Sequence, residues 1–145
     1  MTEMEKDVVI SISGTQTFLG QEPETIELIT QGRYCYEPGK ISFSYTETEM
    51  TGMEGVQTEF LIEDEKTVTL TRSGAIRSVM KFERGVWVES LYDAGVGGAL
   101  LLSVCAKSLT VLLNEHGGVF DLEYDIHIEQ TMCGTHGYHI VIREA

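Results

Sequence analysis

Along most of this chain apolar side chains fall on every second residue, in short runs that end at turn residues. In the run 40–48, Ile41, Phe43 and Tyr45 share one phase, whereas Ser42 and Ser44 occupy the other. Successive side chains of a β-strand point to opposite faces, so a period of two predicts strands with one apolar and one polar face. The pattern predicts an all-β protein.

Turn signals divide the pattern into about ten strands. Pro38-Gly39 suits a type II turn, and the short polar segments 63–66, 72–75 and 83–85 suit hairpins. Consecutive hairpins indicate an antiparallel meander. The predicted strands are roughly 5–13, 24–36, 40–48, 55–63, 66–72, 77–83, 86–93, 98–113, 117–129 and 137–143.

The segment 98–114 has two interpretations. It is rich in Leu and Ala, which makes it the best helical candidate in the chain. Alternate positions from Leu100 to Ala106 are also apolar, and the alternation resumes in the opposite phase from Leu109 to Leu113. A β-bulge near Lys107 would produce this change of phase, so we favour one bent strand, or two strands, over a helix.

Strands of this number with one apolar face each can close into a barrel or form two packed sheets. Closure removes exposed sheet edges, so we predict a single domain, residues 1–145, folded as a closed or nearly closed antiparallel barrel of about 8–10 strands. A two-sheet sandwich stays the alternative. A small barrel holds either its own side chains or one small ligand.

Composition narrows the function classes. The formal net charge is −13, from 23 Asp and Glu against 10 Lys and Arg. Such a surface repels nucleic acids and anionic membranes, so we expect neither as a partner. The cysteines Cys35, Cys105 and Cys133 are odd in number and widely spaced, which is typical of reduced thiols. The start MTEMEKDVV lacks signal-peptide features and no apolar run has the length of a membrane span, so we expect a cytoplasmic protein.

Three stretches of the chain resemble sequences of a known family: TQGRYCYEPGKISFSYTE at 30–47, VTLTRSGAIRSVMKF at 68–82 and VFDLEYDIHI at 119–128. They resemble the YwiB-like family of small bacterial proteins, which are described as calycin-like β-barrels. The resemblance runs over most of the chain and is most specific at 72–74. It implies a lipocalin-like barrel in a cytoplasmic protein of unestablished function, and it supplies no catalytic or ligand-binding residues.

Two charged residues fall on the apolar phase. Arg72 is in step with Leu70, and Glu47 is in step with Phe43, so both are expected to point into the barrel. In an up-and-down meander the strand ends that carry them lie at the same mouth. Tyr92 should reach the same end, together with Ser78.

A guanidinium inside a barrel needs partners, because its desolvation costs several kcal/mol. One interpretation is structural: Arg72 pairs with Glu47 and nearby tyrosines, or reaches solvent at the rim. The other is a ligand site in which Arg72 and Tyr45, with Glu47 and Tyr92 beside them, hold an anionic head group. An apolar tail would then lie against Phe43, Phe60, Leu70 and Phe82. Our leading hypothesis is a protein that binds a small, partly apolar, anionic molecule.

The main alternative is a protein-interaction module with a filled core and no ligand. It would act through its acidic outer face and through apolar positions such as Val9, Leu61 and Val141. The phase of Trp87 is ambiguous, and an outward tryptophan would indicate an interface, so a homodimer stays open. An enzyme is the weaker alternative, because the chain has no catalytic motif and no motif for a cofactor.

The C-terminal histidines provide the one metal-like spacing. Cys133, His136 and His139 are three residues apart, and a hairpin centred near Cys133 would set His127 opposite His139 on the outer face. This glycine-rich segment lacks the tighter cysteine spacing of zinc sites, so a solvated loop without metal is favoured. A haem site is disfavoured because no histidine falls clearly on the interior phase.

Overall fold

The computed structural model describes residues 4–18, 20–49, 53–93, 99–129 and 131–145, which include ten strands. The strands are β1 (Met4–Phe18), β2 (Glu24–Glu37), β3 (Lys40–Thr46), β4 (Gln57–Glu63), β5 (Thr67–Ser73), β6 (Arg77–Glu83), β7 (Trp87–Asp93), β8 (Ala99–Asn114), β9 (Gly117–Ile128) and β10 (Thr131–Glu144).

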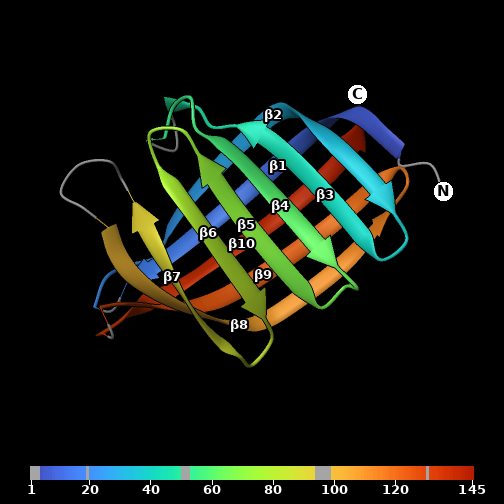
Figure 1. Cartoon of the computed structure of the whole chain (residues 1–145). Coiled ribbons are helices and arrows are strands. Elements are labelled where there is room, and N and C mark those ends of the chain that lie inside the picture. The colour runs from blue at the N-terminus through green and yellow to red at the C-terminus, as the bar shows by residue number, and fades with distance from the viewer. Residues whose placement is uncertain (1–3, 19, 50–52, 94–98, 130) are drawn as a thin grey trace.

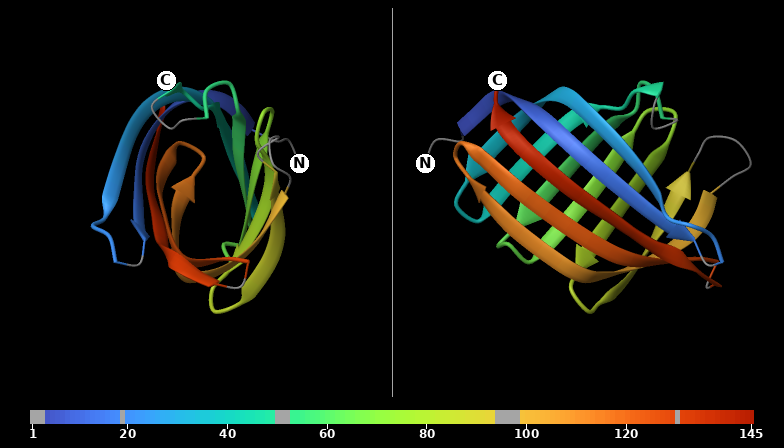
Figure 2. Two further views of the ribbon diagram at one scale, coloured as in Figure 1. Left: turned by 90° about the vertical axis from the view of Figure 1, so that its left-hand side faces the viewer. Right: turned by 180° about the vertical axis from the view of Figure 1, so that it is seen from behind.

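These strands form one closed antiparallel barrel, as predicted (Figure 1). Each strand pairs with its neighbours in sequence, and β1 closes the barrel by pairing with β10 as well as with β2. The turns follow the expected chemistry: Gly39 has a positive φ of 84° in the Pro-Gly turn. Figure 2 shows both chain termini at one end of the barrel, with the 18–24 turn at the other.

Two strands are longer than predicted. β1 continues to Phe18 and β10 starts at Thr131, and the two pair over this added length. Prediction failed here because the inward positions beyond Ile12 and before Tyr138 are not apolar. They are Gly14 and Gln16 on β1 and Gly134 and His136 on β10.

The segment 99–114 is one strand, and the predicted bulge is present. The register of β8 against β9 shifts by one residue between Ala106 and Ser108, so Lys107 is the extra residue. Apolar side chains therefore face inward on both sides of the shift. The described residues contain no helix long and apolar enough to cross a membrane.

Aromatic and aliphatic side chains fill the middle of the barrel. Phe43 and Phe60 stack with ring centroids 4.9 Å apart, and Phe120 meets both edge-on at 5.9 and 5.7 Å. Phe60, Leu70 and Phe82 are completely buried. The interior is a packed core rather than an open lumen.

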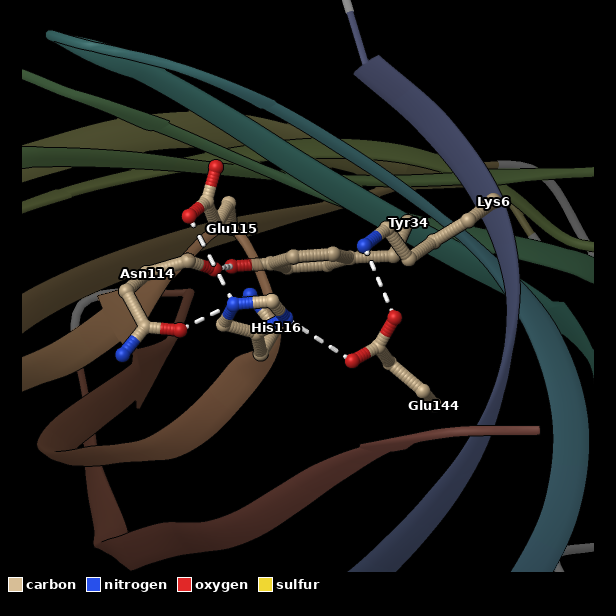
Figure 3. A network of polar contacts seen from close by, with 6 residues as sticks. All are labelled: Lys6, Tyr34, Asn114, Glu115, His116 and Glu144. Carbon is tan, nitrogen blue, oxygen red and sulfur yellow. Dashed lines mark hydrogen bonds and ion pairs between the residues drawn. The ribbon is translucent and has the colours of Figure 1, made fainter.

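A polar network closes the barrel end that carries the termini (Figure 3). The buried Tyr34 hydroxyl donates to the Asn114 carbonyl at 2.7 Å. Glu144 accepts from Lys6 Nζ at 3.0 Å and contacts His116 Nδ1 at 2.9 Å. The hydrogen bonds from Lys6 and His116 lower the pKa of Glu144. Access to the interior is therefore more open at the opposite end, which we call the mouth.

Candidate functional site

A row of polar side chains crosses five neighbouring strands just inside the mouth. The register pairs Tyr45 with Thr58, Thr58 with Arg72, Arg72 with Ser78, and Ser78 with Tyr92. Each of these residues occupies the inward phase of its strand, and on β3 to β6 the next inward position is apolar, whereas on β7 it is Ser90. The fold thus brings an arginine, two tyrosines and two hydroxyl residues to one level of the barrel.

Glu47 lies immediately beyond the end of β3 and is held by the residues that directly precede the neighbouring strand β4. Its backbone N–H donates to the Val56 carbonyl at 2.8 Å, and its carbonyl accepts from Gly55 at 3.2 Å. The side chain is 3% exposed, and its carboxylate accepts a hydrogen bond from the Thr58 hydroxyl at 2.5 Å. These contacts fix a buried negative charge beside the polar row.

Arg72 is 8% exposed, yet it has few partners for a guanidinium. Its Nη2 donates to the Tyr138 hydroxyl at 2.8 Å, and its buried Nε has no partner. Among the described residues no carboxylate lies within 4.0 Å of the guanidinium, so the expected ion pair with Glu47 is not formed. A guanidinium has five N–H donors, and with Nε buried and unpartnered in the described part, Arg72 can donate to a further partner.

The electrostatics of this cluster keep Arg72 charged and the tyrosines neutral. Burial opposes the charge of Arg72, but the hydroxyls of Tyr138, Tyr124 and Tyr45 outweigh it and hold its pKa above the ordinary value. Burial raises the pKa of Tyr45, and the Glu47 carboxylate raises it further. Tyr45 therefore presents a neutral hydroxyl that can donate a hydrogen bond.

His136 and Tyr138 join the site although sequence reasoning left them out. They lie on β10 in phase with Ile140 and Ile142; Tyr138 falls inside the predicted strand 137–143, whereas an earlier start of that strand was needed to include His136. His136 Nδ1 lies 3.4 Å from the Tyr124 hydroxyl, and its buried Nε2 has no partner. Burial lowers the pKa of His136 and the charge of Arg72 lowers it further, which favours the neutral imidazole.

These side chains surround a cavity of about 90 Å³ that opens at the mouth. One wall is apolar and the other is polar. The apolar wall includes Ile12, Ile26 and Leu28, whereas the polar wall comprises Gln16, Tyr45, Glu47, Arg72, His136 and Tyr138. Of the four predicted ligand-binding residues, Tyr45, Glu47 and Arg72 line the cavity and Tyr92 does not.

The four residues predicted to contact an apolar tail deep in the barrel lie outside the cavity. Phe43, Phe60, Leu70 and Phe82 are buried against other core side chains and do not line the cavity. The phase of a strand predicts which side chains point inward, but it does not predict how completely they fill the space. The aliphatic wall at Ile12, Ile26 and Leu28 replaces them.

The expected loop around the C-terminal histidines is also wrong, because this segment belongs to β10. His127 pairs with Met132, and His139 pairs with Asp121, whose carboxylate lies 2.5 Å from His139 Nδ1. The register therefore does not set His127 opposite His139, and the Cys133 side chain lies outside the described part. Within that part no three His, Cys, Asp or Glu side chains gather at a metal-binding distance.

Comparison with known proteins agrees with this fold. A family model described as a domain of unknown function, DUF1934, matches residues 10–140. The chain belongs to this family. The protein named "Uncharacterized beta-barrel protein YwiB" from Bacillus subtilis (strain 168) is 31% identical over 105 residues, which cover 72% of this chain and 71% of that protein. The predicted YwiB-like resemblance is confirmed.

A solved structure shows the same barrel in the DUF1934 family. The crystal structure of the ywiB protein from Bacillus subtilis aligns with a TM-score of 0.83 and 24% sequence identity, over 97% of this chain and 93% of that one. At this identity the likeness shows the fold alone. The role of the mouth therefore has to be argued from the residues that line it.

Proposed function

We propose that this protein binds a small organic carboxylate at the mouth of the barrel. The observation that carries the proposal is the state of Arg72: a buried, charged guanidinium with one neutral phenol as partner and no carboxylate within 4.0 Å among the described residues. A buried charge is stable when it is paired and fully hydrogen-bonded. A bound carboxylate would supply both the charge and the missing acceptors, in the bidentate geometry that arginine favours.

The cavity limits the size of the ligand. Drug-sized ligands occupy roughly 300–1,000 Å³, whereas this cavity measures about 90 Å³. The aliphatic wall at Ile12, Ile26 and Leu28 suits a short branched or linear carbon chain. We therefore propose a short-chain carboxylic acid rather than a fatty acid.

Glu47 adds a second specificity element. Its carboxylate lines the same cavity as Arg72, so the mouth carries one acceptor of hydrogen bonds opposite one charged donor. A ligand with a hydroxyl or ammonium group next to its carboxylate would satisfy both. Hydroxy or amino acids with a small aliphatic side chain fit this arrangement best.

A thermal-shift series with matched ligands tests the proposal. Isovalerate should raise the melting temperature of the protein, whereas isovaleramide, which has the same shape without the charge, should not. We expect 2-hydroxyisovalerate and valine to act at lower concentrations than isovalerate. Native mass spectrometry of freshly purified protein checks for a small acid that co-purifies.

Variants then locate the site. Arg72→Met should abolish the shift with isovalerate, whereas Arg143→Met, a matched change at an exposed residue at the opposite end of the barrel, should preserve it. If isovalerate and its hydroxy and amino derivatives leave the melting temperature unchanged, the proposal fails. An equal shift in both variants would also contradict it, because the anion would then bind elsewhere.

A further inference from the structure

The pairing of neighbouring strands in the barrel wall is interrupted between β6 and β7. These strands pair at Arg77 with Asp93 and at Ser78 with Tyr92, and next at Glu83 with Val86 beside the turn. Between these points Val79–Phe82 and Trp87–Leu91 have no partner across the hairpin, which Figure 1 shows at the front of the barrel. A groove of about 800 Å³ lies along this interval.

Exposed apolar side chains concentrate in this part of the chain, and two of them, Val79 and Leu91, line the groove. Five of the seven large hydrophobic side chains exposed in the described part lie between residues 79 and 100: Val79, Val86, Trp87, Leu91 and Leu100. Leu91 is 64% exposed and Val79 is 48% exposed. By contrast Val9, Leu61 and Val141, which the sequence suggested as exposed apolar positions, are half-buried. Apolar exposure of this kind marks interaction surfaces.

The charges beside the groove form two complementary rows. On the outer face of β6, Arg77 and Lys81 flank Val79, and on the outer face of β7, Glu89 and Asp93 flank Leu91. One row is basic around an apolar centre, and the other is acidic around an apolar centre. A surface with both rows side by side is complementary to itself after a twofold rotation.

The charge balance of the whole chain also favours this face. Segment 77–93 has no net formal charge, because its three basic residues match its three acidic residues: Arg77, Lys81 and Arg84 against Glu83, Glu89 and Asp93. The full charge of −13 therefore lies on the rest of the chain. Two copies that approach through segment 77–93 therefore bring together surfaces with no net formal charge.

We infer that this surface, formed by the outer faces of β6 and β7, binds a second copy of the chain in a twofold-symmetric dimer. The basic row of each copy lies over the acidic row of the other, so that Lys81 meets Glu89 of the second copy. The apolar centres pack together, and the groove receives side chains such as Leu91. Trp87, exposed on the same face, lies at the margin of the contact.

Charge reversal and mixing test this inference. Wild-type protein should show a dimer by sedimentation velocity and native mass spectrometry. Lys81→Glu and Glu89→Lys should each weaken it about tenfold or more, because each variant places like charges together at two symmetric positions. An equimolar mixture of the two variants should dimerise again, because both contacts are then between opposite charges. Lys66→Glu and Glu63→Lys, a matched pair at the β4–β5 turn, should leave the dimer intact.

Each alternative outcome overturns the inference. A wild-type protein that stays monomeric across a hundredfold range of concentration excludes the dimer. If the single variants still dimerise, the interface lies elsewhere on the barrel. A mixture that stays monomeric, with both variants folded by circular dichroism, contradicts the pairing of the two rows. Arg72 lines both this groove and the proposed ligand cavity, but none of the four substituted residues lines that cavity, so the two proposals are tested separately.

Discussion

At the mouth, the burial and the charge of Arg72 and Glu47 have to be considered together. Arg72 and Glu47 lie in the same cavity without forming an ion pair, and each instead contacts a neutral hydroxyl group, of Tyr138 and Thr58 respectively. These contacts keep the Arg72 guanidinium and the Glu47 carboxylate apart inside the cavity. Their separation leaves room for a ligand that has groups for both.

The hydroxyl of Thr58 donates a hydrogen bond to the buried Glu47 carboxylate. Thr58→Val removes this donor while keeping the shape of the side chain, so we expect a loss of about 1.5–3 kcal/mol, typical of a hydrogen bond to a charged group. Thr58→Ser keeps the hydroxyl and should cost about 1 kcal/mol through the lost methyl group. Urea unfolding of the two variants measures the difference, and equal losses would show that the hydrogen bond contributes nothing.

His136 should make stability depend on pH. Burial and Arg72 lower its pKa in the folded protein below the ordinary 6.5, so the unfolded chain takes up the proton first as the pH falls. The contribution of His136 to stability is therefore complete above pH 6.5 and is lost as the pH drops from there to the lowered pKa. Urea midpoints of wild type and His136→Gln at several pH values isolate this effect. Parallel pH profiles for the two proteins would refute it.

At the level of elements, the hairpin of β6 and β7 should be the least stable part of the wall. Amides of Val79–Phe82 and Trp87–Leu91 that point across the interrupted ladder have no partner strand, so we expect them to exchange faster than amides of β4 and β5. Hydrogen exchange of dilute, monomeric protein, resolved by residue, measures this. Uniform protection across the two hairpins would show that the ladder closes in solution.

How well the sequence predicts a strand depends on which residues occupy its inward positions. The alternation of apolar residues predicted the central strands and the bulge at Lys107, because the phase of β8 changes there. It missed the mouth ends of β1 and β10, where Gly14, Gln16, Gly134 and His136 occupy inward positions. Sequence patterns fail where inward residues are selected for a site rather than for the core. The same cause hid His136, whereas Arg72 and Glu47 were found because their strands keep a clear apolar phase.

At the scale of the whole molecule, a packed aromatic core leaves function to the mouth and the outer surface. Packing of the core side chains stabilises the closed barrel of ten strands. The same side chains fill the deep interior that was expected to hold an apolar tail. The charge of −13 spreads over the exterior, and segment 77–93 is balanced. The proposed ligand cavity and the proposed dimer surface lie at the mouth and on the outer wall of one barrel, and Arg72 lines both the cavity and the β6–β7 groove.

We propose that Arg72 serves to bind a ligand and does not stabilise the fold. Equilibrium urea unfolding of wild type and Arg72→Met, without added ligand, tests it most directly. If Arg72 lacks a compensating partner in the free protein, Arg72→Met should raise the free energy of unfolding by about 1 kcal/mol or more, because methionine fills the space without a buried charge. A fall of about 3–5 kcal/mol would show that the guanidinium holds the barrel together, and would contradict the claim.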